Sequence, residues 1–184
     1  MASRKVFAGY LLREIPLFLI STVTCILPDH PHFCRIRGFL ARPFFKSCGR
    51  NFQFGRFVRF IRPGNLVIGN DVYIAEGSWV CGTGGCVLED EVMLGPRCIV
   101  ISTHHGRRNN SYRFAYGKMK AIHIGHGTWL GAHVTVTPGA HIGAGCLVGA
   151  NSVVSGAIMP NQLVRPAAVS SVTIEASIDE NSSL

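Results

Sequence analysis

The chain has 184 residues, 47% of them hydrophobic, and a formal net charge of +8. This length is enough for one domain with a sizeable core. The positive charge lies in one region, because residues 1–62 hold 11 Lys and Arg against 2 Asp and Glu, whereas residues 63–184 hold 7 against 8. The basic region contains no basic-aromatic motif of a nucleic-acid reader, so nucleic acid is not expected as a partner.

Residues 1–53 form a basic and apolar extension. Its apolar runs are Val6–Leu12 and Ile15–Leu27, separated by Arg13 and Glu14. The second run is shorter than the roughly 20 apolar residues that span a bilayer, and no small-x-small cleavage site follows it. One interpretation is a helical cap on the following domain. Another is an interfacial helix with basic residues facing anionic lipid, namely Arg35, Arg37, Arg42, Lys46 and Arg50. We favour a cap that also contacts the inner face of the membrane in a cytoplasmic protein.

A six-residue repeat dominates the rest of the chain. From Ile124 to Met159 the units are IGHGTW, LGAHVT, VTPGAH, IGAGCL, VGANSV and VSGAIM, each beginning with Ile, Leu or Val. A period of six fits neither a helix nor simple strand alternation. It fits a chain that turns a corner every six residues and stacks coil on coil. Gly at the second position would supply the backbone angles of a tight corner.

The same pattern extends towards the N-terminus. It is in register over 68–79, slips by two residues in the Gly-rich stretch Cys81–Cys86, and resumes over 88–99. With three hexads to a coil, residues 18 apart should lie above one another, such as His123 and His141. The sequence therefore predicts an all-β fold of stacked coils over 54–166, followed by a polar tail over 167–184.

Seven cysteines, an odd number without framework spacing, favour reduced thiols. Cys98 and Cys146 occupy small, inward positions of the repeat.

The hexads break once, and the polar segment 101–121 must loop out of the stack. It opens with Thr103, His104 and His105 where a rigid coil ends. Imidazole titrates near neutrality, which suits proton removal from a hydroxyl or amine nucleophile. On composition alone, a solvated loop without a chemical role is an equal alternative.

The repeat resembles that of the hexapeptide-repeat acyltransferases, which fold as left-handed parallel β-helices and work as trimers. Thr103-His104 is similar to the opening of the protruding loop in galactoside and maltose O-acetyltransferases. The resemblance implies that His104 is the general base in a direct transfer and that His105 is a neighbouring substrate contact. Glu76 and Asn109 are further candidates to orient the base or to hold acceptor hydroxyls.

The resemblance also indicates where acetyl-CoA would bind. The segment from Ile124 to Ala132 is similar to the family's "IG…W-I-G" segment, which lines the cleft between subunits. By this match Trp129, Gly131 and Ala132 flank the pantetheine arm, and Ala150 and Ser155 occupy the next contacting positions. The basic residues that meet the phosphates in the family are replaced by Gly156 and Ala168, so Arg165 is the candidate substitute.

Two other functions stay open on the sequence. The γ-class carbonic anhydrases share the fold, and three histidines would hold zinc there. The candidate ligands here are His123, His126, His133 and His141. His126 and His133 occupy different points of their hexads, so no metal is expected. A non-catalytic trimeric scaffold is the second alternative. The preferred hypothesis is a homotrimeric acetyltransferase acting on a sugar hydroxyl in surface-polysaccharide biosynthesis, with acetyl-CoA as donor.

Overall fold

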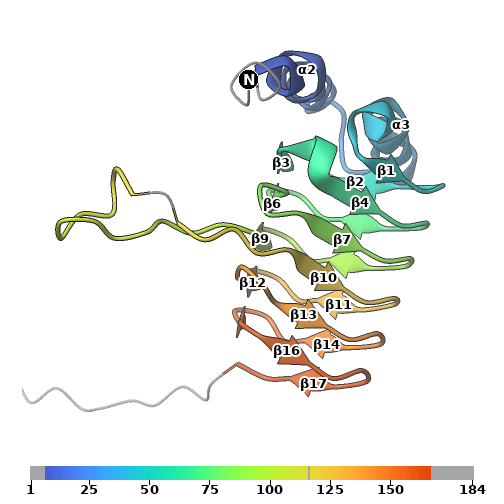
Figure 1. Ribbon diagram of the computed structural model, residues 1–184. Helices are drawn as coiled ribbons and strands as arrows, with labels where there is room; N and C mark the ends of the chain where they lie inside the picture. The colour runs from blue at the N-terminus through green and yellow to red at the C-terminus, as the bar shows by residue number, and fades with distance from the viewer. Residues whose placement is uncertain (1–6, 116, 167–184) are drawn as a thin grey trace, which may run out of the picture.

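The computed structural model describes residues 7–115 and 117–166, which form a parallel β-helix with a helical cap and one projecting arm (Figure 1). The tail over 167–184 lies outside the described residues. Each coil contributes one short strand to each of three sheets, and successive coils pair in parallel. This confirms the all-β stack of coils predicted from the hexads and the left-handed β-helix implied by the resemblance. The first coil begins at Ser47, somewhat before the predicted boundary at residue 54.

The three sheets are called A, B and C. Sheet A contains β1 (Ser47–Cys48), β4 (Leu66–Ile68), β7 (Cys86–Leu88), β10 (Ile122–Ile124), β13 (His141–Ile142) and β16 (Ala157–Ile158). Sheet B contains β2 (Gln53–Phe54), β5 (Tyr73–Ile74), β8 (Met93–Leu94), β11 (Trp129–Leu130), β14 (Leu147–Val148) and β17 (Leu163–Val164). Sheet C contains β3 (Arg59–Ile61), β6 (Trp79–Cys81), β9 (Ile99–Ile101), β12 (Thr135–Val136) and β15 (Val153–Val154).

The register of these sheets follows the repeat. His123 pairs with His141 and Trp129 with Leu147, each 18 residues apart as predicted. The chain passes from sheet B to sheet C at the B–C corner and from sheet C to sheet A at the C–A corner. Residues at the same place in successive coils therefore form columns along the helix axis, about 4.8 Å apart.

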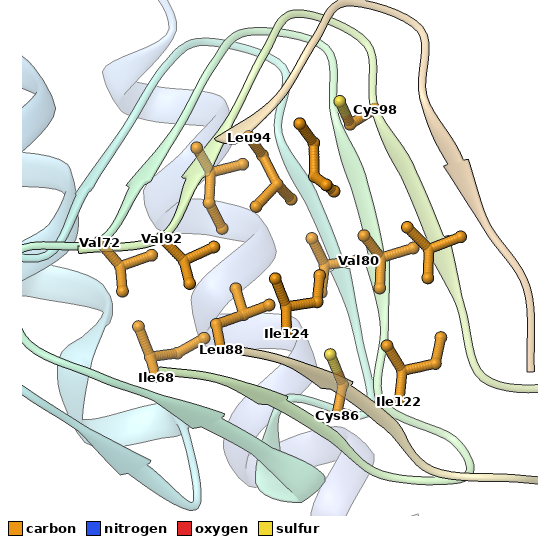
Figure 2. Close-up of a cluster of buried hydrophobic side chains, with 14 of the residues drawn as sticks. Ile68, Val72, Val80, Cys86, Leu88, Val92, Leu94, Cys98, Ile122 and Ile124 are labelled. Atoms are coloured by element: carbon orange, nitrogen blue, oxygen red, sulfur yellow. The ribbon is translucent and has the colours of Figure 1, made fainter. Parts of the chain in front are cut away.

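The core is a column of aliphatic side chains, one from each face of each coil (Figure 2). Ile74, Leu94 and Leu130 from sheet B are all fully buried. The buried polar side chain of Thr128 is satisfied, since its hydroxyl donates to the Gly143 carbonyl (2.8 Å) and accepts from the Cys146 amide (3.2 Å). Cys146 and Cys98 are buried and unpaired, as the repeat predicted.

Glycine at the second hexad position has a different cause from the one expected. Positive φ occurs at the fourth position, where Gly127, His133 and Asn151 stand. The second-position Gly143 lies instead against the next coil, since an added Cβ would come 2.4 Å from the Pro160 nitrogen. Close stacking of corners, rather than an unusual backbone angle, therefore requires glycine there.

The cap consists of a π-helical turn η1 (Tyr10–Glu14), the helices α2 (Ile15–Thr24) and α3 (Pro31–Ala41), and a 3₁₀ turn η2 (Arg42–Phe44). A second 3₁₀ turn, η3 (Pro63–Asn65), follows β3. Leu17 of α2 and Ala41 of α3 join the core of the first coil, and α3 packs along β2. The predicted helical cap is therefore present, and it closes the end of the stack.

Two expectations for the extension were wrong. The apolar helix is continuous over Phe7–Thr24, long and apolar enough by length and composition to cross a membrane, and 11% of it is buried. Arg37 does not face outwards, because it is 1% exposed and pairs with Asp29 at 2.7 Å. Its guanidinium also donates to the carbonyls of Thr24 and Leu27, which ties α3 to the end of α2.

The arm comprises residues 102–121 and projects from the stack between β9 and β10 (Figure 1). It is a loose hairpin, bridged at Thr103 and Met119 near its root and at Arg108 and Ser111 near its tip. The root is fixed by Ser102, which is buried, donates to the Cys81 carbonyl (2.6 Å) and accepts from the Gly84 amide (2.9 Å). The slip at 81–86 and the arm therefore occupy the C–A corners of successive coils, and Ser102 joins the two corners.

Candidate active site

His104 lies at the root of the arm, two residues after the buried Ser102. Its imidazole is exposed, and Nδ1 is 3.2 Å from the carbonyl oxygen of His105. A carbonyl can only accept, so this contact requires the tautomer that carries the proton on Nδ1. In the neutral ring with this tautomer, Nε2 keeps its lone pair, which is what a general base needs.

Gly117, on the returning strand of the arm, sets the position of the His104 backbone. A Cβ at Gly117 would come 1.5 Å from the His104 carbonyl oxygen, so only glycine fits. The Gly106 amide also donates to the Ala115 carbonyl at 3.3 Å across the hairpin. His104 is therefore held by a rigid coil on one side and by the close return of the arm on the other.

The predicted acceptor contacts lie in three different places. His105 lines an open hollow together with Tyr112, Arg113 and Phe114. Asn109 lies in the turn at the tip of the arm with φ of 48°. Glu76 lies at the B–C corner, and its carboxylate is 3.6 Å from the Arg56 guanidinium. Within one chain, His105 is close to the candidate base, whereas Glu76 is at the opposite end of sheet C.

The predicted acetyl-CoA contacts cluster mainly along sheet B and the B–C corner. Trp129 is 48% exposed and belongs to an outward row on sheet B, which also contains Tyr73, Met93, Leu147 and Leu163. Gly131 follows β11 and stacks against the next coil, where its Cβ would come 2.7 Å from the Ala150 nitrogen. Ala132 is the next residue at this corner, and Arg165 follows β17 on the same side.

Ser155 differs from the other donor candidates. It follows β15 at the C–A corner, in the column that contains Ile101 at the start of the arm. The predicted residues thus divide into a group around the C–A corner, with His104, His105 and Ser155, and a group around the B–C corner. Sheet C separates the two groups in one chain.

Buried cysteines contribute packing rather than a nucleophile. Burial raises the pKa of the Cys98 thiol to about 11, and the thiol donates to the Gly131 carbonyl at 3.1 Å. Burial likewise raises the pKa of Cys86 to about 12. A thiol with such a pKa is almost fully protonated at neutral pH and is a poor nucleophile.

The histidines of the coils form a stack on sheet A. The rings of His123 and His141 are parallel, with centroids 4.6 Å apart, and His123 Nε2 is 2.9 Å from a Glu89 carboxylate oxygen. Across residues 7–115 and 117–166, no three His, Cys, Asp or Glu side chains are grouped so that they could hold a metal ion. The zinc hydratase alternative therefore has no candidate ligand set in the described part of the chain.

Comparison with known proteins agrees with this architecture. Residues 121–156 match the family model for the bacterial transferase hexapeptide (six repeats). Galactoside O-acetyltransferase of Escherichia coli K12 is 29% identical over 137 residues, which cover 72% of this chain and 66% of that protein. Residues 121–156 therefore carry hexapeptide repeats of the bacterial transferase type.

A second relative covers more of the chain. WbbJ of Escherichia coli K12, a proposed lipopolysaccharide biosynthesis O-acetyl transferase, is 26% identical over 177 residues, covering 89% of this chain and 87% of WbbJ. Among solved structures, the hexapeptide-repeat acetyltransferase VCA0836 of Vibrio cholerae in complex with acetyl coenzyme A has a TM-score of 0.73. It is 21% identical and covers 88% of this chain and 84% of its own, which shows a shared fold.

Three arm residues beside His105 were not singled out by the sequence analysis: Tyr112, Arg113 and Phe114. The sequence signal that could have drawn attention to Arg113 is the charge of the arm, because residues 102–121 contain five Lys and Arg and no carboxylate.

Proposed function

We propose that this chain is an O-acetyltransferase that moves an acetyl group from acetyl-CoA to a sugar hydroxyl, with His104 as general base. The observation that carries the proposal is the His104 imidazole, fixed at the root of the arm with Nδ1 towards a carbonyl and Nε2 free. The match of residues 121–156 to the transferase hexapeptide model and the similarity to a protein named galactoside O-acetyltransferase support this chemistry.

The proposed step needs no covalent enzyme intermediate. His104 Nε2 takes the proton from the acceptor hydroxyl as its oxygen attacks the thioester carbonyl carbon of acetyl-CoA. The tetrahedral intermediate collapses, the carbon–sulfur bond breaks, and the imidazolium returns its proton to the leaving thiolate. The products are the O-acetylated sugar and free CoA. Backbone N–H groups at the coil corners are candidates to stabilise the oxyanion.

Assembly of more than one copy would complete the site. The base is at the C–A corner, whereas Trp129, Gly131, Ala132, Ala150 and Arg165 surround the B–C corner. Joining the two groups in one cleft requires the B–C corner of one copy to face the arm of another. We therefore propose a homotrimer with shared clefts, and the outward apolar row on sheet B is a suitable surface for the contacts.

The proposed activity is tested by following CoA release from acetyl-CoA with a panel of sugars. His104→Ala should lower kcat/KM by about 10²–10⁴-fold, the range for loss of a general base. The matched control is His126→Ala, an equally exposed histidine on a coil, which should keep wild-type turnover. An unchanged rate in His104→Ala would refute the assignment of the base. Failure of every protein to release CoA, with no donor binding, would favour the scaffold.

We further propose that the reaction belongs to surface-polysaccharide biosynthesis and takes place at the inner face of the membrane. Similarity to WbbJ along most of both chains supports the first part. The second is supported by a broad exposed apolar surface on the cap, because patches of this kind mark interaction sites. It comprises Phe7, Leu11, Leu12, Phe18, Leu19, Val23, Ile26, Ile36, Phe39 and Leu40.

The same N-terminal region carries exposed basic residues, namely Arg35, Arg42, Lys46 and Arg50, which favours anionic lipid. The tethers from Arg37 to the end of α2 hold the apolar helix against the stack, so it would lie in the interface rather than cross it.

Flotation with anionic and neutral vesicles tests the membrane contact. The wild-type protein should float with anionic vesicles, and Leu12→Gln combined with Phe39→Gln should not. Phe114→Gln, an exposed apolar residue of the arm, serves as the control. Equal flotation of all three proteins would rule out the cap as the membrane surface.

A further inference from the structure

The arm carries a concentrated positive charge that the proposed chemistry does not use. Residues 102–121 contain five Lys and Arg and no Asp or Glu. None of the ion pairs in the described part of the chain involves an arm residue. Like charges held on one short hairpin repel one another, which disfavours the folded arm unless an anion offsets them.

One of these cations lies in a hollow that also contains His105, the residue after the candidate base. Arg113 lines an open hollow of about 500 Å³ with His105, Tyr112 and Phe114. The Arg113 guanidinium carbon is 5.4 Å from the centroid of the Phe114 ring, and this cation–π contact gives the guanidinium a preferred direction. Arg107, by contrast, donates to the Asn110 side chain at 2.8 Å, within the tip of the arm.

The chemistry of this hollow suits a ring that bears an anionic group. A guanidinium presents a planar fork of donors that matches a carboxylate or a phosphate. Tyr112 and Phe114 are exposed and offer aromatic faces to the apolar face of a ring. Because His105 belongs to the same hollow and follows His104 directly, a ligand held there would be the acceptor.

We propose that the hollow lined by His105, Tyr112, Arg113 and Phe114 is an acceptor subsite, and that Arg113 selects a sugar carrying a carboxylate or a phosphate. This rests on the proposed function for its catalytic meaning, but binding of the charged sugar can be tested without turnover. The arm thus combines the base with the group that sets acceptor specificity.

The binding experiment compares two sugars that differ by one group, methyl β-glucuronide and methyl β-glucoside, with glucose 1-phosphate as the phosphate probe. Calorimetric titration of the whole protein should show both charged sugars binding about tenfold or more tightly than the glucoside, the size of one charge-assisted hydrogen bond. The preferred charged sugar identifies the source of the anion. Arg113→Met should abolish the preference. Lys118→Met makes the same charge change elsewhere on the arm and should alter it less than twofold.

The kinetic experiment separates acceptor from donor. With a charged acceptor, Arg113→Met should raise the acceptor KM about tenfold or more and leave the KM for acetyl-CoA unchanged. A rise in the acetyl-CoA KM instead would assign the arginine to the phosphates of CoA and overturn the proposal. Equal effects of Arg113→Met and Lys118→Met would mean that the overall positive charge of the arm attracts the acceptor. This result would also overturn the proposal.

Two controls keep the subsite and the proposed activity distinct. His104→Ala should still bind the charged sugar with the wild-type preference, so lost turnover with retained preference supports the subsite. A wild-type protein that binds the charged and neutral sugars equally refutes the subsite, whether or not it transfers acetyl groups. A change of oligomeric state in Arg113→Met, measured by light scattering, would make Arg113 a subunit contact and refute the subsite too.

Discussion

The coils and the arm differ in how far their side chains are buried and in how their backbone groups are paired. In the coils, each inward residue is buried against its equivalents in neighbouring coils, and the backbone groups pair along three sheets. In the arm, two isolated bridges join the strands, and Tyr112, Phe114 and Met119 are exposed. Residues in the coils are therefore explained by packing, whereas those of the arm have few structural partners. The difference separates the segment that stabilises the fold from the segment that holds the candidate base.

The cap gives the largest expected effect on stability. Arg37→Met keeps most of the buried volume but removes the guanidinium that pairs with Asp29 and donates to the carbonyls of Thr24 and Leu27. Asp29 then keeps Arg56 as a partner. Breaking a buried ion pair of this kind costs about 3–5 kcal/mol. Chemical denaturation should show a loss of this size, and Arg35→Met, which removes an exposed charge from the same helix, should change stability by less than about 0.5 kcal/mol. Equal stability of the two variants would mean that Arg37 does not hold the cap.

A matched pair of glycine substitutions tests the separation between coil and arm directly. Gly143→Ala brings a Cβ to 2.4 Å from the Pro160 nitrogen in the next coil, so it should destabilise the fold by about 1–3 kcal/mol. Gly117→Ala brings a Cβ to 1.5 Å from the His104 carbonyl oxygen and should move the base. A displacement of about 1 Å can cost about 100-fold in rate.

The two glycine variants should therefore affect different properties, one the turnover and the other the stability. Gly117→Ala should lose turnover with a thermal midpoint close to wild type, and Gly143→Ala should lower the midpoint while keeping turnover below it. Loss of stability in Gly117→Ala equal to that in Gly143→Ala would show that the arm is part of the folded core, and the comparison would fail.

The hexads were sufficient to predict the stack, because a period of six leaves few other architectures. They did not give the reason for glycine at the second position, since the approach of Pro160 to Gly143 depends on how closely successive coils lie. The sequence also could not predict that Arg37 is buried. An arginine in a basic segment looks exposed until its partners, Asp29 and two carbonyls at a helix end, are brought together by the fold.

The length of the apolar helix was missed for a related reason. Arg13 and Glu14 divide the apolar run in the sequence, but the helix continues through them. Arg13 donates to the carbonyls of Phe44 and Phe45, and Glu14 is 3.8 Å from Arg62. For the site, the break in the repeat and the histidine doublet pointed to the arm, and the family resemblance then indicated His104 as the candidate base. The sequence did not show that sheet C separates His104 from most of the donor candidates, because this depends on the corner at which the fold places each residue.

The smallest expected effect concerns the pH dependence of the coils. Burial raises the pKa of Cys98 to about 11, whereas an unfolded cysteine has a pKa of about 8.5. The unfolded chain therefore releases this proton first, so the contribution of the buried thiol to stability is complete below about pH 8.5 and is lost as pH rises towards 11.

Cys98→Ser keeps a donor for the Gly131 carbonyl and does not titrate. Its free energy of unfolding should fall less steeply between pH 8.5 and 10.5, by at most about 1.4 kcal/mol per pH unit. His104→Ala, on the exposed arm, should follow the wild-type slope. Parallel curves for Cys98→Ser and wild type would mean that this thiol ionises as easily in the folded as in the unfolded chain. The core of the coil would then be open to water, and the contrast with the exposed arm would fail.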